Sequence, residues 1–244
     1  MVIFSSVSPQ PQYLMRNLSL LALLLILLPA CASAPPEESV RPGINDNFLD
    51  PELDAATWTK RFEGESREVY ANRDKIAAAM RIQPGMTVAD VGAGTGMMLN
   101  TLASSTGKDG TVYAVDISPG MIDHLRQRSA DEGLDQVEVV HCSDRSSELP
   151  RNSVDRVVII DTYHHFEYPI STMSSIHKAL RKGGEVLIVD FERIPGVSRE
   201  WILGHVRAGK EVVLQELEKA GFMLLEDVPM KELEENYVLR LGKK

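Results

Sequence analysis

The distribution of apolar residues divides the chain into three parts. An almost unbroken apolar run covers residues 18–28, a polar, proline-containing stretch covers 32–50, and shorter apolar segments follow. Residues 51–63 and 65–80 carry apolar side chains at helical spacing, which predicts two amphipathic helices. The pattern therefore predicts a leader, a tether over residues 31–50 and a folded domain over 51–244, with 51–80 as an N-terminal helical cap.

From residue 83 onward, short β-branched runs alternate with helical segments. Continuous apolar strands separated by helices are typical of a parallel sheet covered on both faces. A long amphipathic helix over 199–220 follows, and the last two strands have too short a connection for a parallel crossover. The pattern predicts an α/β fold, a doubly wound Rossmann-like sheet of seven strands with the last antiparallel and helices on both faces. The expected strands are 87–91, 111–117, 137–142, 154–161, 185–191, 222–228 and 237–241.

The apolar run at residues 18–28 is too short to cross a bilayer as a stable helix, which needs roughly 20 apolar residues. A positive charge at Arg16, a short apolar run and then small residues are typical of a secretory signal segment. We therefore expect a signal peptide over residues 1–30 and export of the mature chain.

The residues that end this leader resemble a bacterial lipobox, with Leu28-Pro-Ala-Cys31 as the match. The resemblance implies lipidation of Cys31, which would tether the domain to the periplasmic face of a bacterial membrane without a membrane span. The alternative is cleavage by ordinary signal peptidase, which would give a soluble periplasmic protein with Cys31 incidental.

Beyond the predicted leader the chain is acidic. Removing residues 1–30 removes Arg16 and no acidic residue, which leaves 35 acidic and 25 basic side chains. Binding to phosphates needs clustered lysine and arginine, so nucleic acid is not an expected partner. Cys142 is the one cysteine beyond Cys31, which excludes a disulfide framework and a cysteine-based metal site.

A glycine-rich loop follows the first strand of the domain. In Asp90-Val-Gly-Ala-Gly-Thr-Gly96, glycine stands at three alternate positions before a helix. Glycine permits positive φ and lets a ligand approach the backbone, and the helix N-terminus presents unpaired N–H groups. NAD-binding loops usually read G-x-G-x-x-G, whereas the third glycine here comes one residue early. The loop alone predicts a nucleotide-type ligand.

Carboxylates stand at or just after the ends of four predicted strands, at Asp90, Asp116, Asp144 and Asp161. Open α/β sheets bind ligands at the carboxyl ends of their strands. Asp116, twenty residues past the last glycine, is placed to accept the hydroxyls of a ribose. Asp90 has the alternative of capping the turn, and Ser143 or Arg145 could replace Asp144.

With the Leu-Arg-Lys-Gly-Gly-Glu-Val-Leu-Ile-Val-Asp segment at strand five, these motifs resemble class I (Rossmann-like) S-adenosylmethionine-dependent methyltransferases of the small-molecule or quinone type. The resemblance spans residue 82 to the C-terminus and implies S-adenosyl-L-methionine as cofactor. It implies that the loop holds the methionine part, Asp116 the ribose, Ile117 the adenine ring and Asp144 its amino group. The cofactor-binding residues expected from it are Asp90, Gly92, Ala93, Gly94, Thr95, Gly96, Asp116, Ile117, Asp144 and Asp161.

The acceptor side of the pocket is less clear from the sequence. His164 and His165 follow strand four, where a histidine could act as a general base or could merely position neighbouring groups. The resemblance implies that the early helices and the long late helix roof the pocket; the alternative is that their charged faces are simply solvated. The histidines show no metal-ligand spacing, so no metal site is predicted. The roof candidates are Arg61, Arg67, Tyr70, His205 and Arg207.

Two classes of function remain open. The first is methyl transfer to an unidentified small-molecule or lipid-like acceptor, and the second is a non-catalytic lipoprotein that binds S-adenosylmethionine or a nucleoside. Export favours the second, because S-adenosylmethionine is made in the cytoplasm. A dehydrogenase is disfavoured by the glycine spacing and by the Lys-Gly-Gly strand. The sequence identifies neither the acceptor atom nor the oligomeric state.

Overall fold

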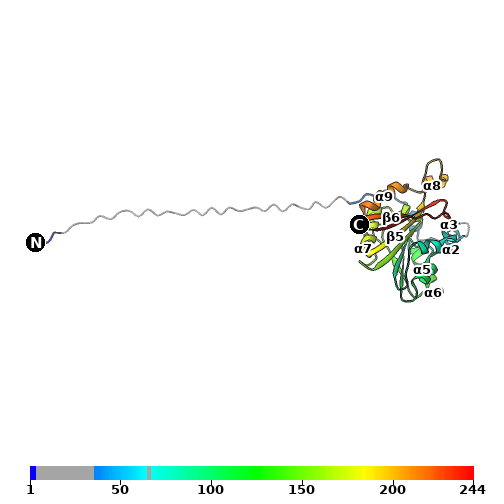
Figure 1. Ribbon diagram of the computed structural model, residues 1–244, viewed down its shortest axis with the longest axis horizontal. Coiled ribbons are helices and arrows are strands. Elements are labelled where there is room, and N and C mark those ends of the chain that lie inside the picture. Colours follow the sequence, from blue (N-terminus) through cyan, green and yellow to red (C-terminus); the bar gives the residue numbers. More distant parts are fainter. Residues whose placement is uncertain (4–35, 65–66) are drawn as a thin grey trace. The chain divides into compact units, whose positions relative to one another are not determined.

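A seven-stranded sheet forms the centre of the domain in the computed structural model (Figure 1). The strand order is β3-β2-β1-β4-β5-β7-β6, and β7 is antiparallel to both of its neighbours while the other adjacent strands pair in parallel. This arrangement confirms the predicted doubly wound sheet and the antiparallel pairing of the last two strands. The strands are β1 (Thr87–Val91), β2 (Thr111–Asp116), β3 (Val137–His141), β4 (Val154–Ile160), β5 (Leu180–Phe191), β6 (Phe222–Asp227) and β7 (Asn236–Lys243).

The structure describes residues 1–3, 36–64 and 67–244. The predicted lipidation site at Cys31 and nearly all of the predicted leader lie outside this part of the chain. Within it, every helix is too short or too polar to span a membrane. The helical segments are α1 (Asp46–Leu49), α2 (Ala55–Phe62), α3 (Glu68–Ala71), α4 (Arg73–Ala79), α5 (Leu99–Thr106), α6 (Pro119–Asp131), η1 (Tyr163–His165), α7 (Pro169–Ala179), α8 (Glu200–His205) and α9 (Lys210–Lys219).

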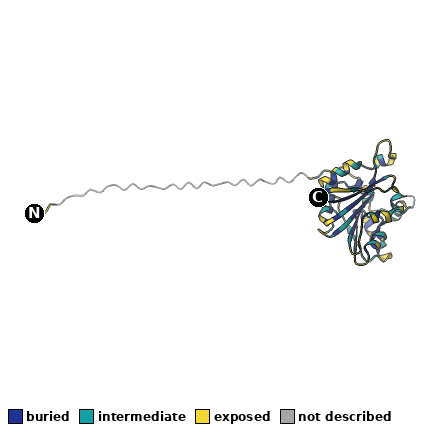
Figure 2. Ribbon diagram, in the orientation of Figure 1, coloured by how far each residue is buried: buried dark blue, intermediate teal, exposed yellow. Residues whose placement is uncertain are grey.

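Helices cover both faces of the sheet, and a separate apolar core lies on each face. Met173 and Ile176 of α7 and Leu217 of α9 pack on one face. Leu102 of α5 and Leu125 of α6 pack on the other, together with side chains of α4. In Figure 2 the strands are mostly buried and exposed positions gather on the outer helices. The β-branched runs of the sequence are therefore buried on both sides, as a doubly wound sheet requires.

Several predicted helices are shorter than the sequence pattern indicates. The predicted helix over 199–220 is two helices, because Val206 adopts an extended conformation that ends α8. Gly209 then caps the start of α9. Arg207, in the break, forms an ion pair with Glu216 in which both side chains are almost buried. The apolar spacing in the sequence continues across this break, so the pattern predicted one helix. The Arg207–Glu216 ion pair stabilises the break.

Part of the predicted tether belongs to the folded domain, so the predicted domain start at residue 51 is too late. The compact unit extends over Glu37–Lys244. The Glu37 carboxylate accepts hydrogen bonds from the backbone N–H groups of Ile170 and Ser171, at 2.9 and 2.7 Å. These N–H groups lie in the first turn of α7, where backbone donors have no partner within the helix and a carboxylate is stabilising. A proline-rich composition gave no sign of this long-range helix cap.

Candidate functional site

A cavity of about 980 Å³ opens at the carboxyl ends of strands β1, β2, β4 and β5. This is the edge at which open α/β sheets bind ligands. Its volume is at the upper end of the roughly 300–1,000 Å³ found for small-molecule pockets. The glycine loop forms one side of the cavity, and α1, α2, η1 and α8 contribute the other. The space is sufficient for a cofactor together with a second small molecule.

The glycine loop takes the conformation that its sequence predicts. Gly92, Gly94 and Gly96 have φ values of +81°, +55° and +83°. A Cβ on Gly92 would lie 2.1 Å from the Thr162 side chain, so any larger residue would collide there. At Gly94 the nearest such atoms are 3.9 Å away, which leaves space beside the backbone. Gly92 therefore permits close packing, and Gly94 leaves a cradle that a side chain would fill.

Asp116 holds the second side of this cradle. One carboxylate oxygen accepts the N–H of Gly94 at 2.7 Å, and the other accepts the N–H of Ser118 at 2.8 Å. Burial raises the pKa of Asp116, and these backbone hydrogen bonds partly offset the increase. A carboxylate has about four acceptor positions. Asp116 therefore retains capacity for two hydroxyl groups of a ligand in the cavity.

Two of the predicted cofactor-binding residues do not line the cavity. Asp90 is buried, and burial together with the Asp116 charge raises its pKa to about 7. Gly96 faces the core: a Cβ there would meet Leu99 at 2.8 Å and Leu125 at 3.0 Å. The structure thus gives Gly96 a packing role between loop and helix. Contact of Asp90 with the cofactor stays a prediction.

The remaining loop and adenine-side predictions all line the cavity. The Thr95 hydroxyl donates to Glu63 at 2.7 Å, and Arg128 bonds both the Glu63 carboxylate and the Thr95 carbonyl. This network fixes the loop from the side of α6. Asp144 is exposed, so its carboxylate is accessible to a ligand. The other lining residues in this group are Ala93 and Ile117.

Asp161 lines the cavity, but its carboxylate is engaged by the protein. Arg67 forms an ion pair with one oxygen at 2.5 Å, and the Asn236 amide donates to the other at 2.6 Å. Burial raises the pKa of Asp161 although the Arg67 charge acts in the opposite direction. Asp161 therefore connects β4 to the roof and to β7, and its contact with the cofactor stays a prediction.

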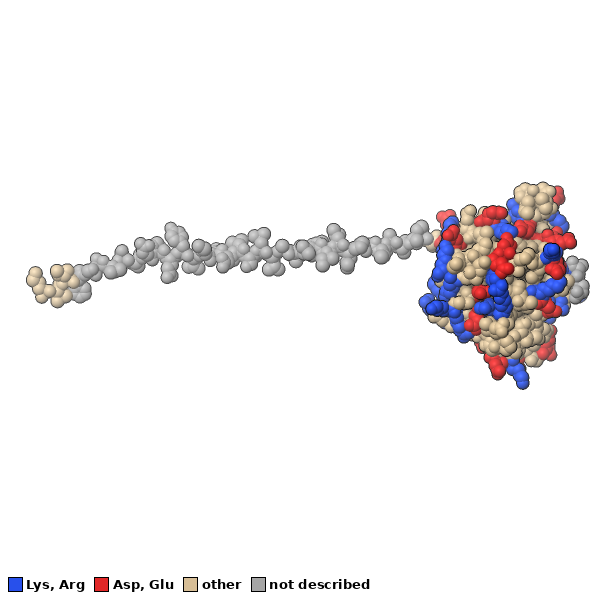
Figure 3. Space-filling view, in the orientation of Figure 1, with Lys and Arg blue, Asp and Glu red and all other residues tan. Residues whose placement is uncertain are grey.

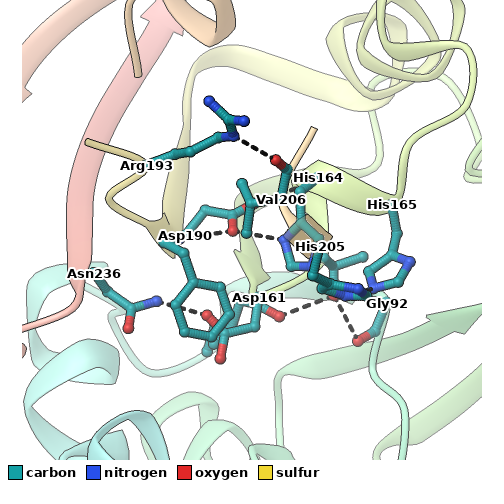
Figure 4. A network of polar contacts seen from close by, with 12 residues as sticks. Gly92, Asp161, His164, His165, Asp190, Arg193, His205, Val206 and Asn236 are labelled. Atoms are coloured by element: carbon teal, nitrogen blue, oxygen red, sulfur yellow. Dashed lines mark hydrogen bonds and ion pairs between the residues drawn. The ribbon is translucent and has the colours of Figure 1, made fainter. Parts of the chain in front are cut away.

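Three histidines come together on the opposite side of the cavity. His164 Nδ1 lies 2.7 Å from a carboxylate oxygen of Asp190, whose second oxygen accepts the His164 backbone N–H at 2.9 Å. His165 Nε2 lies 3.2 Å from His205 Nε2. Figure 4 shows the three imidazoles beside Asp190, with Asp161 and Asn236 close by. One ligand nitrogen from each histidine lies within 4.8 Å of the other two.

Burial keeps two of these imidazoles uncharged. It lowers the pKa of His165 to about 3 and that of His205 to about 4, and the neighbouring His164 acts in the same direction. Burial opposes ionisation of Asp190 as well, but its contacts with His164 lower the pKa of Asp190 below the usual value. At neutral pH the cluster therefore offers free imidazole lone pairs next to an ionised carboxylate.

Aromatic rings form the roof over the histidines. The Phe48 ring lies 4.8 Å from that of Trp58, which lies 5.1 Å from Phe62. Trp201 stacks on His205 with ring centroids 4.8 Å apart. These residues come from α1, α2 and α8 and all line the cavity. This half of the cavity is therefore suited to a flat or apolar molecule.

Sequence reasoning found some of this wall and missed the rest. Arg61, Arg67 and His205 line the cavity as expected of roof residues, whereas Tyr70 and Arg207 do not. Sequence reasoning missed the aromatic roof and Asp190. Asp90, Asp116, Asp144 and Asp161 were selected because each is a carboxylate at or just after the end of a strand. Asp190, at the end of the fifth strand, meets the same criterion, so the sequence contained a signal for it. No sequence signal brought His205 next to His164 and His165.

Part of the chain is similar to known methyltransferases. Residues 89–188 match the family described as a methyltransferase domain. Over 122 residues the chain is 25% identical to the ubiquinone/menaquinone biosynthesis C-methyltransferase UbiE of Coxiella burnetii. This match covers 50% of this chain and 49% of that protein. The chain thus spans about half the length of the curated relatives it matches.

Solved structures show the same fold. A SAM-dependent methyltransferase from Aquifex aeolicus superposes with a TM-score of 0.69 at 23% identity, covering 78% of this chain and 98% of that one. The [4+2]-cyclase SpnF superposes with a TM-score of 0.60 at 17% identity, covering 71% and 81%. The chain thus shares the fold of these structures and contains a segment similar to a methyltransferase domain, and these likenesses imply S-adenosylmethionine as cofactor.

The cavity fits this cofactor. Gly94 leaves a cradle that a Cβ would fill, and Asp116 keeps acceptor positions for the two ribose hydroxyls. Ile117 lines the same cavity and would supply an apolar contact for the adenine ring, and the Asp144 carboxylate is exposed to the cavity. On the face in Figure 3, positive and negative side chains of the described residues are interspersed.

Proposed function

We propose that the protein transfers a methyl group from S-adenosylmethionine to a small-molecule or lipid-like acceptor. One observation carries this proposal: a single cavity contains both the cradle at Gly94 and Asp116 and the aromatic, histidine-rich half. The likeness to a ubiquinone/menaquinone biosynthesis C-methyltransferase supports an acceptor of quinone type.

When bound, the cofactor supplies an electrophilic methyl carbon, so the protein's main tasks are alignment and exclusion of water. The aromatic roof on Phe48, Trp58 and Trp201 can hold a planar acceptor against the histidines. His165 is a poor base at neutral pH because its pKa is about 3. His164, held by Asp190, is the better placed of the two predicted bases.

Calorimetry with S-adenosylhomocysteine, S-adenosylmethionine and NAD tests the cofactor half of the proposal. We expect both S-adenosyl ligands to bind and NAD not to bind. Transfer of a tritiated methyl group to quinone precursors, or to a lipid extract, tests the acceptor half. NAD binding without S-adenosyl binding would refute the proposal. Tight S-adenosyl binding without turnover would favour the non-catalytic binding protein.

The proposal extends to location. The signal-like leader and the lipobox-like residues before Cys31 support export and lipid anchoring at the periplasmic face. Palmitate labelling of the expressed full chain tests this, and we expect the label to be lost in Cys31→Ser. Label retained in that variant, or absent from the native chain, would refute lipidation at this cysteine. Fractionation of the same cells separates a soluble periplasmic protein from a cytoplasmic one.

A further inference from the structure

We propose that His164, His165 and His205 form a binding site for a divalent transition-metal ion of the zinc type. The site lies where η1 and α8 line the cavity. The proposal does not depend on methyl transfer, because metal binding can be measured without S-adenosylmethionine.

The spacing of the ligand atoms carries the proposal. His165 Nε2 and His205 Nε2 are 3.2 Å apart. Zinc–imidazole bonds of about 2.0–2.1 Å in a tetrahedral site place two ligand nitrogens roughly 3.3 Å apart. The third nitrogen, from His164, lies within 4.8 Å of both. Small side-chain shifts of His165 and His205, with the His164 ring kept on Asp190, would complete a three-histidine site.

The surroundings of His164 resemble the second layer of known metal sites. Metal-bound histidines usually donate their other ring N–H to a carboxylate, which fixes the ring and its tautomer. Asp190 fills this role at 2.7 Å from Nδ1, so Nε2 is the nitrogen left for an ion. Asp190 is itself held by the backbone N–H groups of His164 and Phe191. A carboxylate fixed this firmly orients the ring before any ion arrives.

The charges and rings around the cluster permit an ion. Asp190 and Asp161 place two carboxylates near His164. Arg41 and Arg61 lie near His205 and oppose a cation, so the carboxylates are needed to offset them. The rings of Phe48, Phe191 and Trp201 also contact the cluster and keep water from much of it.

Three protein ligands in a cavity wall leave a fourth position toward the cavity. Structural zinc sites have four protein ligands, whereas catalytic sites keep one position for water or substrate. All three histidines line the cavity that we assign to the acceptor. An oxygen or nitrogen atom of the acceptor could therefore complete the coordination. Metal binding through Nε2 would exclude His164 as a general base, since one lone pair cannot serve both roles.

The direct test is metal binding by the full chain, purified without a polyhistidine tag and freed of metal with a chelator. We expect calorimetry with zinc chloride to give one site with micromolar or tighter affinity. Cobalt(II), used as a spectroscopic probe, should give the intense visible bands of a tetrahedral site. No zinc binding at 100 micromolar, or only octahedral cobalt spectra, would overturn the proposal.

Variants locate the site. His165→Ala and His205→Ala should each weaken zinc binding at least 100-fold, and the isosteric Asp190→Asn should weaken it about 10- to 100-fold. His177→Ala, on α7 and outside the cluster, is the matched control and should bind zinc as the native chain does. Unchanged affinity in both cluster variants would overturn the proposal.

A parallel titration separates this proposal from the proposed function. S-adenosylhomocysteine should bind the His165→Ala variant as it binds the native chain, which would also show that the variant is folded. Loss of zinc binding with retained S-adenosylhomocysteine binding supports the metal site whether or not methyl transfer occurs. If circular dichroism shows that His205→Ala is unfolded, His205→Gln replaces it in the series.

Discussion

The two halves of the cavity are built in different ways. The cofactor half consists of two short stretches, residues 91–95 and 116–117, which contribute loop backbone and one carboxylate fixed by backbone hydrogen bonds. The acceptor half is assembled from side chains of α1, α2, η1 and α8, which are far apart in the chain. The backbone half depends on local conformation. The side-chain half depends on long-range packing, and it can therefore change while the cofactor half is kept.

The sharpest test of the cofactor half is Asp116→Ala. It removes the predicted acceptor of the ribose hydroxyls and the bond that holds Gly94, each a charged hydrogen bond worth about 1.5–3 kcal/mol. We expect S-adenosylhomocysteine to bind roughly 100-fold more weakly in calorimetry. Asp135→Ala, an exposed carboxylate, should leave the affinity unchanged. Native affinity in Asp116→Ala would show that the ligand binds elsewhere.

Arg67→Met tests how the two halves are joined. The substitution leaves the buried Asp161 charge without its ion-pair partner. Since Arg67 is partly exposed, we expect about 2 kcal/mol loss in the free energy of unfolding, measured with urea. The matched control is Arg126→Met, which breaks a solvent-exposed ion pair with Asp123 and should cost at most about 0.5 kcal/mol. Equal losses in both variants would contradict a special role for the buried pair.

Asp90→Asn tests whether the carboxyl group of Asp90, buried beneath the glycine loop, keeps its proton up to near-neutral pH. Because the pKa of Asp90 is about 7 in the folded chain and its ordinary value is 3.8, unfolding releases a proton between these values. Stability therefore falls as pH rises from 4 to 7, by up to about 1.4 kcal/mol per pH unit from this group. We expect urea unfolding of the variant to lose that part of the slope. An unchanged slope would mean that Asp90 is ionised in the folded state.

Gly94→Ala has the smallest expected effect. A Cβ at φ +55° is strained by about 1 kcal/mol and fills part of the cradle. We expect about tenfold weaker S-adenosylhomocysteine binding. Gly133→Ala is the matched control, because Gly133 has φ +64° and no atom within 4 Å of the added Cβ. Both variants should lose similar stability in thermal unfolding. Weaker binding in both would mean that backbone strain, not the cradle, is responsible.

The sequence could predict the cofactor half because its information is local. Three alternate glycines and a carboxylate at a strand end require the conformations that the structure shows at Gly94 and Asp116. The same reasoning could not separate Gly96, which packs on the core, from Gly94, since both have positive φ. That difference depends on Leu125 of a later helix.

The acceptor half could be predicted only in part. His164 and His165 were found from their place after strand four, but the third histidine arrives from α8, forty residues later. The strands and their order follow from apolar runs, because burial on both faces leaves a strong pattern. The break between α8 and α9 could not be predicted in this way, because the Arg207–Glu216 ion pair at the break is polar and leaves no periodic apolar pattern.

The roof over the cavity has little anchoring of its own. Neither α1 nor α2 contains a buried residue, although their rings Phe48, Trp58 and Phe62 pack on one another and Phe48 also contacts His165. Segments with few buried contacts open locally at much lower free energy than the sheet beneath them. We therefore expect the backbone amides of α1 and α2 to exchange hydrogen faster than those of the strands.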